Sequence, residues 1–308
     1  MIPNRVTLCE VGPRDGLQNE AAPVAAADKI ELVRRLEAAG LREIEVTSFV
    51  SPKWVPQMAD NTEVLQGLVK PAGVRYAVLT PNLKGLEGVL ALPADKRPDE
   101  VVVFGAASEA FSRRNINCSI DESLERFAPV VAAAHEAGLK VRAALSCAVG
   151  CPYQGEVSAD EVERVVKGFK AIGVDHCGVA DTIGVGTPRK VQAAMERALK
   201  HFPLVEVSGH FHDTYGQSLA NIYACLEMGV HSFDASVAGL GGCPYAKGAT
   251  GNVATEDVVF MLDGLGIHTG IDLQALVDAG AYISGVLGRP PASRVGRALL
   301  ARRPAVVA

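Results

Sequence analysis

The stretch Val205–Gly229, VEVSGHFHDTYGQSLANIYACLEMG, contains one complete strand–helix unit. Its first part is an extended, mostly apolar run that ends at His212, and its second part is the amphipathic segment Ser218–Met228. A glycine directly after a predicted helix is a common C-cap, so Gly229 marks the end of the unit. The number of times that such a unit recurs along the chain decides the fold class.

Eight such units follow one another. Short runs rich in β-branched residues predict strands at Val6–Val11, Glu43–Phe49, Val74–Thr80, Glu100–Gly105, Lys140–Ser146, His176–Ala180, Val205–His212 and Ser232–Ala238. Amphipathic segments that predict helices follow nearly all of them, including Ala26–Ala39, Glu122–Ala137, Ala159–Ile172, Pro188–His201 and Ser218–Met228. Eight strand–helix units over roughly 250 residues is the number and size of a (β/α)₈ barrel, the TIM barrel of the α/β class.

A doubly wound open sheet is the main alternative fold. It would leave roughly two or three of the predicted strands unassigned. It would also be expected to carry a glycine-rich dinucleotide motif after the first strand, and Gly12-Pro13-Arg14-Asp15-Gly16 is not that motif. The barrel is therefore the prediction.

The chain is predicted to form a single catalytic domain over residues 1–308, because no composition shift or long linker divides it. The barrel should occupy about residues 5–240. A lid loop and additional C-terminal helices, Thr255–Leu265 and Leu273–Leu287, should occupy about 241–288. The basic tail, 289–308, is expected to be a solvated and partly mobile end.

Composition restricts the class of protein. The 308 residues are 48% hydrophobic and 21% charged, which is typical of a soluble protein with a substantial core. A net charge of −5 gives no reason to expect a nucleic-acid partner, and the seven scattered cysteines do not form a secreted disulfide framework. The N-terminus lacks the apolar stretch of a signal peptide, and no apolar run is long enough to cross a bilayer. We therefore expect a cytoplasmic protein with no membrane partner.

His210 and His212 are one residue apart at the end of a predicted strand. Alternate side chains of a strand leave on the same face, so both imidazoles can reach one ion. Such a pair also arises by accident, but active sites of TIM barrels lie at the C-terminal ends of the strands, where this pair falls. The same rim should receive further polar residues from distant parts of the chain, namely Arg14, Asp15, Glu45, Thr47, Ser48, Asp181, Thr182, Cys243 and Asn252.

The residue types at this rim suggest a metal site. Two imidazoles, one carboxylate and an amide oxygen suit Mg²⁺ or Mn²⁺, whereas zinc would be expected to gather thiolates. Each residue also has a simpler interpretation. Asp15 lies in a good turn sequence, Asn252 can be a helix N-cap, and Arg14 can form a structural ion pair or supply positive charge to an enolate oxygen.

The most glycine-dense part of the chain, residues 239–252, is predicted to be a loop that closes over a substrate. It carries Cys243, where a thiol can act as a proton donor or nucleophile, and the other cysteines are expected to be inert. A similar sequence, Gly150-Cys151-Pro152-Tyr153, is attributed to shared turn chemistry. Arg113 and Arg114 offer guanidinium groups suited to phosphate, although a solvated basic turn explains them equally well.

Three motifs together resemble hydroxymethylglutaryl-CoA lyases. They are residues 11–20 (VGPRDGLQNE), residues 45–58 (EVTSFVSPKWVPQM) and the loop from Gly242-Cys243-Pro244-Tyr245 to Asn252. The similarity extends from about Val6 to Gly288. The chain is more loosely similar to the wider group of metal-dependent barrel lyases and synthases, in which the cysteine-bearing loop marks the lyase branch.

The resemblance implies an activity and a set of roles. The family cleaves 3-hydroxy-3-methylglutaryl-CoA to acetyl-CoA and acetoacetate with Mg²⁺ or Mn²⁺, usually as a homodimer. The matching metal ligands are Asp15, His210, His212 and Asn252. The matching catalytic arginine and loop cysteine are Arg14 and Cys243, and the matching acidic positions are Glu45, Asp181 and Glu256. The tail lacks the cysteine-containing extension of some eukaryotic members.

These roles predict a retro-Claisen cleavage. Asp181, working with His210, is the first candidate for the base that removes the hydroxyl proton, with Glu45 as an orienting group. Arg14 would stabilise the enolate, and Cys243 would protonate it. Thr182, Ser48, Arg113, Arg114 and Glu256 are candidate substrate-binding residues. Three alternatives stay open: a lyase for a bulkier 3-hydroxy-3-alkylglutaryl-CoA such as the isohexenyl compound, a 2-His-1-carboxylate iron oxygenase, and a catalytically silent metal-binding barrel.

Overall fold

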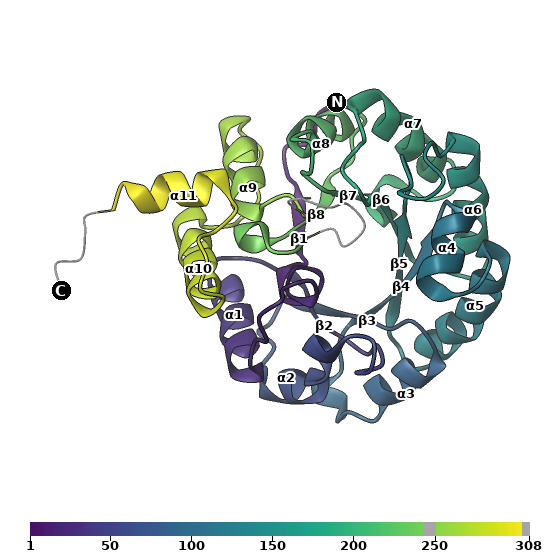
Figure 1. Cartoon of the computed structure of the whole chain (residues 1–308), viewed down its shortest axis with the longest axis horizontal. Coiled ribbons are helices and arrows are strands. Elements are labelled where there is room, and N and C mark those ends of the chain that lie inside the picture. The colour runs from purple at the N-terminus through teal and green to yellow at the C-terminus, as the bar shows by residue number, and fades with distance from the viewer. Residues whose placement is uncertain (243–250, 304–308) are drawn as a thin grey trace.

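A computed structural model describes residues 1–242 and 251–303 of the chain. Eight parallel strands close into a barrel in sequence order, with β1 paired to β8 (Figure 1). The strands are β1 Thr7–Glu10, β2 Glu43–Ser48, β3 Arg75–Leu79, β4 Glu100–Ala106, β5 Lys140–Ser146, β6 His176–Asp181, β7 Val207–Phe211 and β8 Ser232–Ala235. The predicted TIM barrel is confirmed.

Helices surround the strands as an outer ring (Figure 1). They are α1 Ala26–Ala38, α2 Asn61–Gly67, α3 Leu83–Leu90, α4 Glu109–Ile116, α5 Ile120–Glu136, α6 Ala159–Ala171, α7 Pro188–Leu199, α8 Ser218–Glu227, α9 Thr255–Gly264, α10 Leu273–Val286 and α11 Arg294–Ala301. The start of α6 shows why a helix begins where it does, because Ser158 and Glu161 form a reciprocal capping box there. Its buried residues Val162, Val166 and Phe169 recur at helical spacing and so lie on one face.

At β7 and β8, a helical turn takes up part of the predicted strand. Residues Leu204–Glu206 form a short helical turn before β7, and Val205 is 69% exposed. After β8, residues Val237–Gly239 form another turn, in which Ala238 has a left-handed backbone with φ of 57°. The chain therefore leaves the sheet just after Ala235.

The inside of the barrel is unusually polar. Outward-facing residues of β4 such as Val101 and Val103 belong to the main core between strands and helices. TIM-barrel interiors are commonly filled by branched apolar side chains. Here Arg142 from β5 and Asp234 from β8 instead form an ion pair with both side chains buried. A small separate apolar cluster of Ala77, Leu79 and Val102 occupies the β3–β4 side. The interior thus has a charged side and an apolar side.

The C-terminal helices complete the ring between α8 and α1 (Figure 1). Tyr282 on α10 donates a hydrogen bond to Asp28 Oδ1 at 2.8 Å, and the Arg35 guanidinium lies 4.4 Å from the centre of its ring. None of the described helices is long and apolar enough to cross a membrane.

Within the basic segment expected to be a solvated and partly mobile end, residues 294–301 form helix α11, in which only Gly296 is buried. The Ser293 hydroxyl and the Val295 amide both donate to Asp257 Oδ1, at 2.7 and 2.8 Å. Ser293 also caps α11, since its oxygen accepts from the Gly296 amide. Hydrogen bonds to a carboxylate on α9 therefore hold this basic segment as a docked helix.

Candidate active site

A cavity of about 180 Å³ opens inside the barrel. Its charged side is formed by residues from the turn after β1, from β2, from the end of β7 and from β8, namely Arg14, Asp15, Glu45, His210, His212 and Asp234. Its apolar side is formed by Leu79, Val102, Phe104 and Phe111. Distant parts of the sequence therefore meet at one cavity, as the barrel rule predicts.

Asp15, His210 and His212 each offer a ligand atom, and these atoms all lie within 4.8 Å of one another. His212 Nδ1 is buried and has no hydrogen-bond partner among the described residues. A buried nitrogen without a partner is costly unless something else binds it. Asn252 Nδ2 donates to Asp15 Oδ2 at 2.8 Å. The backbone of Asn252 also forms an isolated antiparallel β-bridge with the backbone of His212. The four predicted ligands are thus together, and this donor set fits a divalent cation.

The turn after β1 places Arg14 and Asp15 at the cavity. It is a single wide helical turn over Gly12–Gly16. A Cβ on Gly12 would lie 2.6 Å from Glu10 Oε1, and a Cβ on Gly16 would lie 2.7 Å from the Leu240 Cβ. Glycine is therefore required at both ends, where the backbone approaches its neighbours closely.

The protonation states of Asp15 and His212 suit metal binding. Burial alone would raise the pKa of Asp15, but the nearby Arg14, His210 and His212 lower it well below its usual range. Burial and the neighbouring His210 lower the pKa of His212 to about 4. Near neutral pH the site therefore presents an ionised carboxylate and a neutral imidazole, which are the forms that ligate metals.

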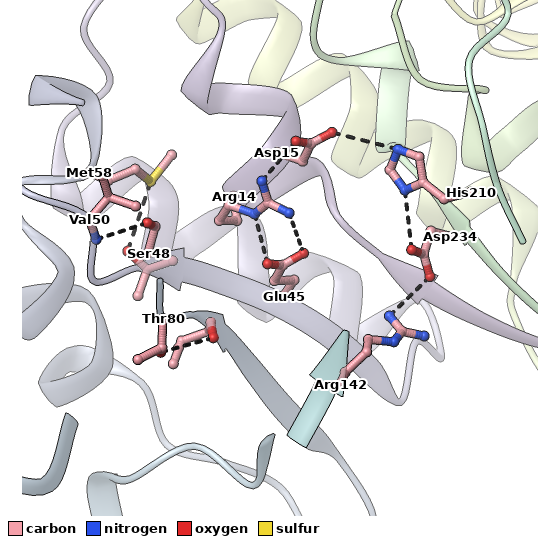
Figure 2. Close-up of polar contacts among 12 residues, drawn as sticks. Arg14, Asp15, Glu45, Ser48, Val50, Met58, Thr80, Arg142, His210 and Asp234 are labelled. Atoms are coloured by element: carbon pink, nitrogen blue, oxygen red, sulfur yellow. Dashed lines mark hydrogen bonds and ion pairs between the residues drawn. The ribbon is translucent and has the colours of Figure 1, made fainter. Parts of the chain in front are cut away.

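Arg14 is held by two carboxylates (Figure 2). Its Nε and Nη2 donate to Glu45 at 2.7 and 2.8 Å, and its Nη1 donates to Asp15 at 2.8 Å. Burial would lower the pKa of Arg14, but Glu45 and Asp15 raise it, so the guanidinium stays charged. The two interpretations of Arg14 are compatible, because the ion pair itself positions the positive charge on the cavity wall.

Sequence reasoning missed Asp234 and Arg142, which both line the cavity. His210 Nδ1 lies 3.1 Å from Asp234 Oδ2, and Arg142 Nη1 donates to Asp234 Oδ1 at 3.0 Å (Figure 2). One signal was available. Each is a charged residue in the middle of a predicted apolar strand, and such residues are almost never fully buried unless paired.

Asp181 does not present its carboxylate to the cavity. The side chain is buried, and its two oxygens accept hydrogen bonds from the Val185 and Gly186 amides at 3.1 and 2.7 Å. Burial raises the pKa of Asp181 to about 6. The geometry therefore assigns Asp181 to holding the loop after β6. Its neighbour Thr182 does line the cavity, and Thr182 Oγ1 accepts from the Cys147 amide at 2.7 Å.

Three predicted substrate-binding residues are absent from the described residues that line the cavity, namely Ser48, Arg113 and Arg114. Ser48 is fully buried, and its hydroxyl accepts from the Val50 amide at 3.1 Å. Arg114 lies over the Tyr153 ring, 4.7 Å from its centre. Their predicted contacts with CoA stay untested. Cys243, the predicted proton donor, lies outside the described residues.

Glu256 also lies away from the cavity. It is fully buried, and both carboxylate oxygens accept from the Ala238 amide, at 2.9 and 3.0 Å. The Ala238 carbonyl accepts in turn from the Ala292 and Ser293 amides, so this contact joins the turn after β8 to the segment before α11. Glu256 is therefore placed as a structural residue, in contrast to its predicted role in substrate binding.

The buried Glu256 carboxyl should make stability depend on pH. Burial raises its pKa from 4.5 to about 8. The folded state thus binds this proton more tightly than the unfolded state, so the stabilisation is complete below pH 4.5 and is lost as pH rises toward 8. We expect Glu256→Gln to reduce the fall in unfolding free energy between these limits, measured by urea denaturation at several pH values.

The unfolding free energy of Glu256→Gln should still fall somewhat as pH rises. Burial also raises the pKa of Glu10 to about 7, which contributes a fall of the same sign. Glu10 accepts from the Gly12 and Val237 amides, so it is held in the same region. An unchanged slope in Glu256→Gln would show that the carboxyl is ionised in the folded protein.

Comparison with known proteins identifies the family of the chain. The HMGL-like family model matches residues 5–283. A relative from Pseudomonas aeruginosa, named 3-hydroxy-3-isohexenylglutaryl-CoA/hydroxy-methylglutaryl-CoA lyase, is 56% identical over 301 residues, which are 98% of this chain and 99% of the relative. The mitochondrial hydroxymethylglutaryl-CoA lyase of Homo sapiens is 54% identical over 297 residues, covering 96% of this chain and 90% of the human protein.

The similarity holds in three dimensions. The crystal structure of hydroxymethylglutaryl-CoA lyase from Pseudomonas aeruginosa matches with a TM-score of 0.94 at 56% identity. The match covers 98% of this chain and 99% of that structure. It therefore includes both the barrel and nearly all of the chain that follows it.

Proposed function

The chain belongs to the HMGL-like family, and we propose from this premise that it is a divalent-metal-dependent carbon–carbon lyase. Its substrate is 3-hydroxy-3-methylglutaryl-CoA, which it cleaves to acetyl-CoA and acetoacetate. The relatives from Pseudomonas aeruginosa and Homo sapiens are both named for the hydroxymethylglutaryl substrate. The observation that supports the proposal most directly is the close grouping of Asp15, His210 and His212 beside the buried Arg14.

The cation would be held by Asp15, His210, His212 and the amide oxygen of Asn252, and Mg²⁺ or Mn²⁺ suits this mixed oxygen and nitrogen set. Such an ion lowers the pKa of a hydroxyl bound to it and polarises neighbouring oxygens. The apolar side of the cavity, formed by Leu79, Val102 and Phe104, suits the methyl and methylene carbons of the substrate.

Arg14 carries the electrostatic part of the reaction. A base first takes the proton of the tertiary hydroxyl, the part predicted for Asp181 with His210, and of these two His210 lines the cavity. When the resulting alkoxide collapses to the ketone of acetoacetate, the C2–C3 bond breaks and its electron pair moves into the thioester enolate of acetyl-CoA. The described contacts of Arg14 use three of its five N–H groups, so two are available to an enolate oxygen. Glu45 accepts two hydrogen bonds from the guanidinium, so the positive charge is already in position and does not have to reorient during the reaction.

We assign the final proton transfer to Cys243, because its sequence position lies in the glycine-rich loop. Its thiol would protonate C2 of the enolate and complete acetyl-CoA. We expect Cys243→Ala to lower kcat by about 10²–10⁴-fold, the range typical of a general acid, while KM and Mn²⁺ affinity change little. Steady-state kinetics and Mn²⁺ titration measure this. Normal turnover in Cys243→Ala would remove the cysteine from the mechanism.

The alternatives are less well supported. An iron oxygenase would use the same ligand types, but the relatives are named as lyases over nearly the full chain. A silent metal-binding barrel leaves the buried Arg14–Glu45 pair on the cavity wall without a purpose. The bulkier isohexenyl substrate appears in the name of the Pseudomonas aeruginosa relative and not in that of the human one, so the methyl compound is the substrate that both names share.

One assay tests the proposal. Purified enzyme is treated with EDTA and then given Mg²⁺ or Mn²⁺, and acetyl-CoA release is measured with the methyl and the isohexenyl thioester. We expect release from the methyl compound that is lost with EDTA and restored by either ion. Release that EDTA does not affect would contradict metal dependence. A homodimer, as the family resemblance implies, is checked by light scattering of the same preparation.

A further inference from the structure

Behind His210, an ion pair spans the barrel interior and has no part in the chemistry described above. Arg142 leaves β5 and donates from Nη1 to Asp234 Oδ1 on β8 at 3.0 Å, although β5 and β8 are not neighbours in the barrel. The two side chains are only 6% and 10% exposed. The second oxygen of Asp234 lies 3.1 Å from His210 Nδ1, as Figure 2 shows.

Stability alone does not explain this pair. Removing two charges from water offsets most of the energy of their attraction, so apolar residues of similar size stabilise a protein as well or better. Branched apolar side chains usually fill this level of a TIM barrel. The pair also joins a second contact, because Asp234 is shared between Arg142 and His210. Its position behind a candidate metal ligand points to a role in the site.

We propose that Arg142 and Asp234 form a positioning relay that fixes the ring orientation and tautomer of His210, with Nε2 facing the cation. The relay rests on the proposed function, since the cation is its premise. His210 Nε2 lies 3.9 Å from Asp15 Oδ2, on the side of the metal ligands, and Nδ1 faces Asp234 on the other side. Carboxylates behind metal-ligating histidines fix the tautomer in this way and raise the basicity of the ligand.

Arg142 contributes by holding the Asp234 carboxylate. Its Nη2 also donates to Ser208 Oγ at 3.3 Å, so partners on β7 and β8 fix the planar guanidinium. Beside this charge Asp234 is ionised and can only accept a hydrogen bond. His210 Nδ1 must then donate, which leaves the lone pair on Nε2 for the cation.

Asp234→Asn is the sharpest test. The amide oxygen would accept from Arg142, which turns the amide NH₂ toward His210 Nδ1. The nitrogen Nδ1 must then accept, so the proton moves to Nε2 and blocks the ligand. We expect the Mn²⁺ dissociation constant of metal-stripped enzyme to rise about 10–100-fold, measured by electron paramagnetic resonance. Nitrogen NMR of labelled histidine should show the exchanged tautomer without metal.

Arg142→Gln tests the other half of the relay. We expect a rise of about tenfold in the Mn²⁺ dissociation constant, with activity recovering as Mn²⁺ is increased. Because the two residues act in series, Arg142→Gln with Asp234→Asn should bind Mn²⁺ no more weakly than Asp234→Asn alone. Arg164→Gln is the matched control, since it breaks an exposed ion pair with Asp121 and leaves every contact of the relay in place. Its Mn²⁺ affinity should stay within about twofold of the unmodified enzyme.

The outcomes distinguish failure of the relay from failure of the cation site. Normal Mn²⁺ affinity and an unchanged His210 tautomer in Asp234→Asn, with a lower Tm, would overturn the relay and leave a structural ion pair. Failure of the unmodified enzyme to bind Mn²⁺, or normal binding by His212→Ala, would instead refute the cation site itself. If Arg142→Gln does not fold, the isosteric Asp234→Asn decides the question alone.

Discussion

Arg14→Gln should lower kcat by about 10³–10⁵-fold, which is the range contributed by an arginine that stabilises transition-state charge. The reason is the place of the guanidinium. It lies on the cavity wall beside Asp15, is held by Glu45 at 2.7 and 2.8 Å, and keeps two N–H groups for a developing enolate. KM should change much less, because the negative charge exists only as the carbon–carbon bond breaks.

The affinity for Mn²⁺ should not fall in this variant. Removing a positive charge from beside Asp15 takes away a neighbour that repels the cation. Steady-state kinetics and Mn²⁺ titration on the same sample therefore separate the two roles. A fall in Mn²⁺ affinity matching the fall in kcat would show that Arg14 acts through the metal ligands.

Loss of Arg14 also leaves Glu45 buried without its partner, which typically costs about 3–5 kcal/mol of stability. The double variant Arg14→Gln, Glu45→Gln removes both charges and controls for this. Its Tm should recover relative to Arg14→Gln, and its turnover should not. Arg164→Gln breaks an exposed ion pair with Asp121 and should leave kcat unchanged. Turnover that recovers with Tm would assign Arg14 to the fold.

The fold could be predicted because its signal is local. Each strand and each helix carries its own periodicity, and the expected bounds agree with the structure to within about two residues for most elements. The exceptions have physical causes that periodicity does not show. The strand expected to end at Ala238 stops at Ala235, because Ala238 adopts a left-handed turn held by Glu256. The helix α11 forms where basic composition suggested a solvated end, because Asp257 binds its first turn.

The site could be predicted only in part, for a related reason. The ligands lie at or shortly after the C-terminal ends of strands, so the barrel rule finds Asp15 and the two histidines from position alone. The pairing of Arg142 with Asp234 joins residues 92 positions apart and depends on the closing of the barrel. The direction in which a side chain points is also not predictable from the sequence. Asp181 is the example, because its carboxylate points toward the amides of its own loop. Candidate functional residues at strand ends can thus be predicted from the sequence, whereas contacts across the barrel interior cannot.

His212→Ala should abolish tight cation binding and, with it, activity at micromolar Mn²⁺. Its imidazole is one of the three grouped ligands, and its Nδ1 has no partner among the described residues. Loss of a direct ligand should weaken Mn²⁺ by more than the roughly 10–100-fold typical of residues behind a ligand. The pKa of His212 is lowered to about 4 by burial and by His210, so the ring is neutral at pH 7 and its removal does not change the charge of the site.

The weakening can therefore be attributed to the lost ligand atom and not to electrostatics. Millimolar Mn²⁺ should restore part of the turnover, because Asp15, His210 and Asn252 still offer donors. His201→Ala removes a histidine that pairs with Glu163 outside the cavity and should leave Mn²⁺ affinity unchanged. If His212→Ala bound Mn²⁺ as tightly as the unmodified enzyme, the ion would have to lie elsewhere, and the lyase chemistry would lose the group that activates its substrate.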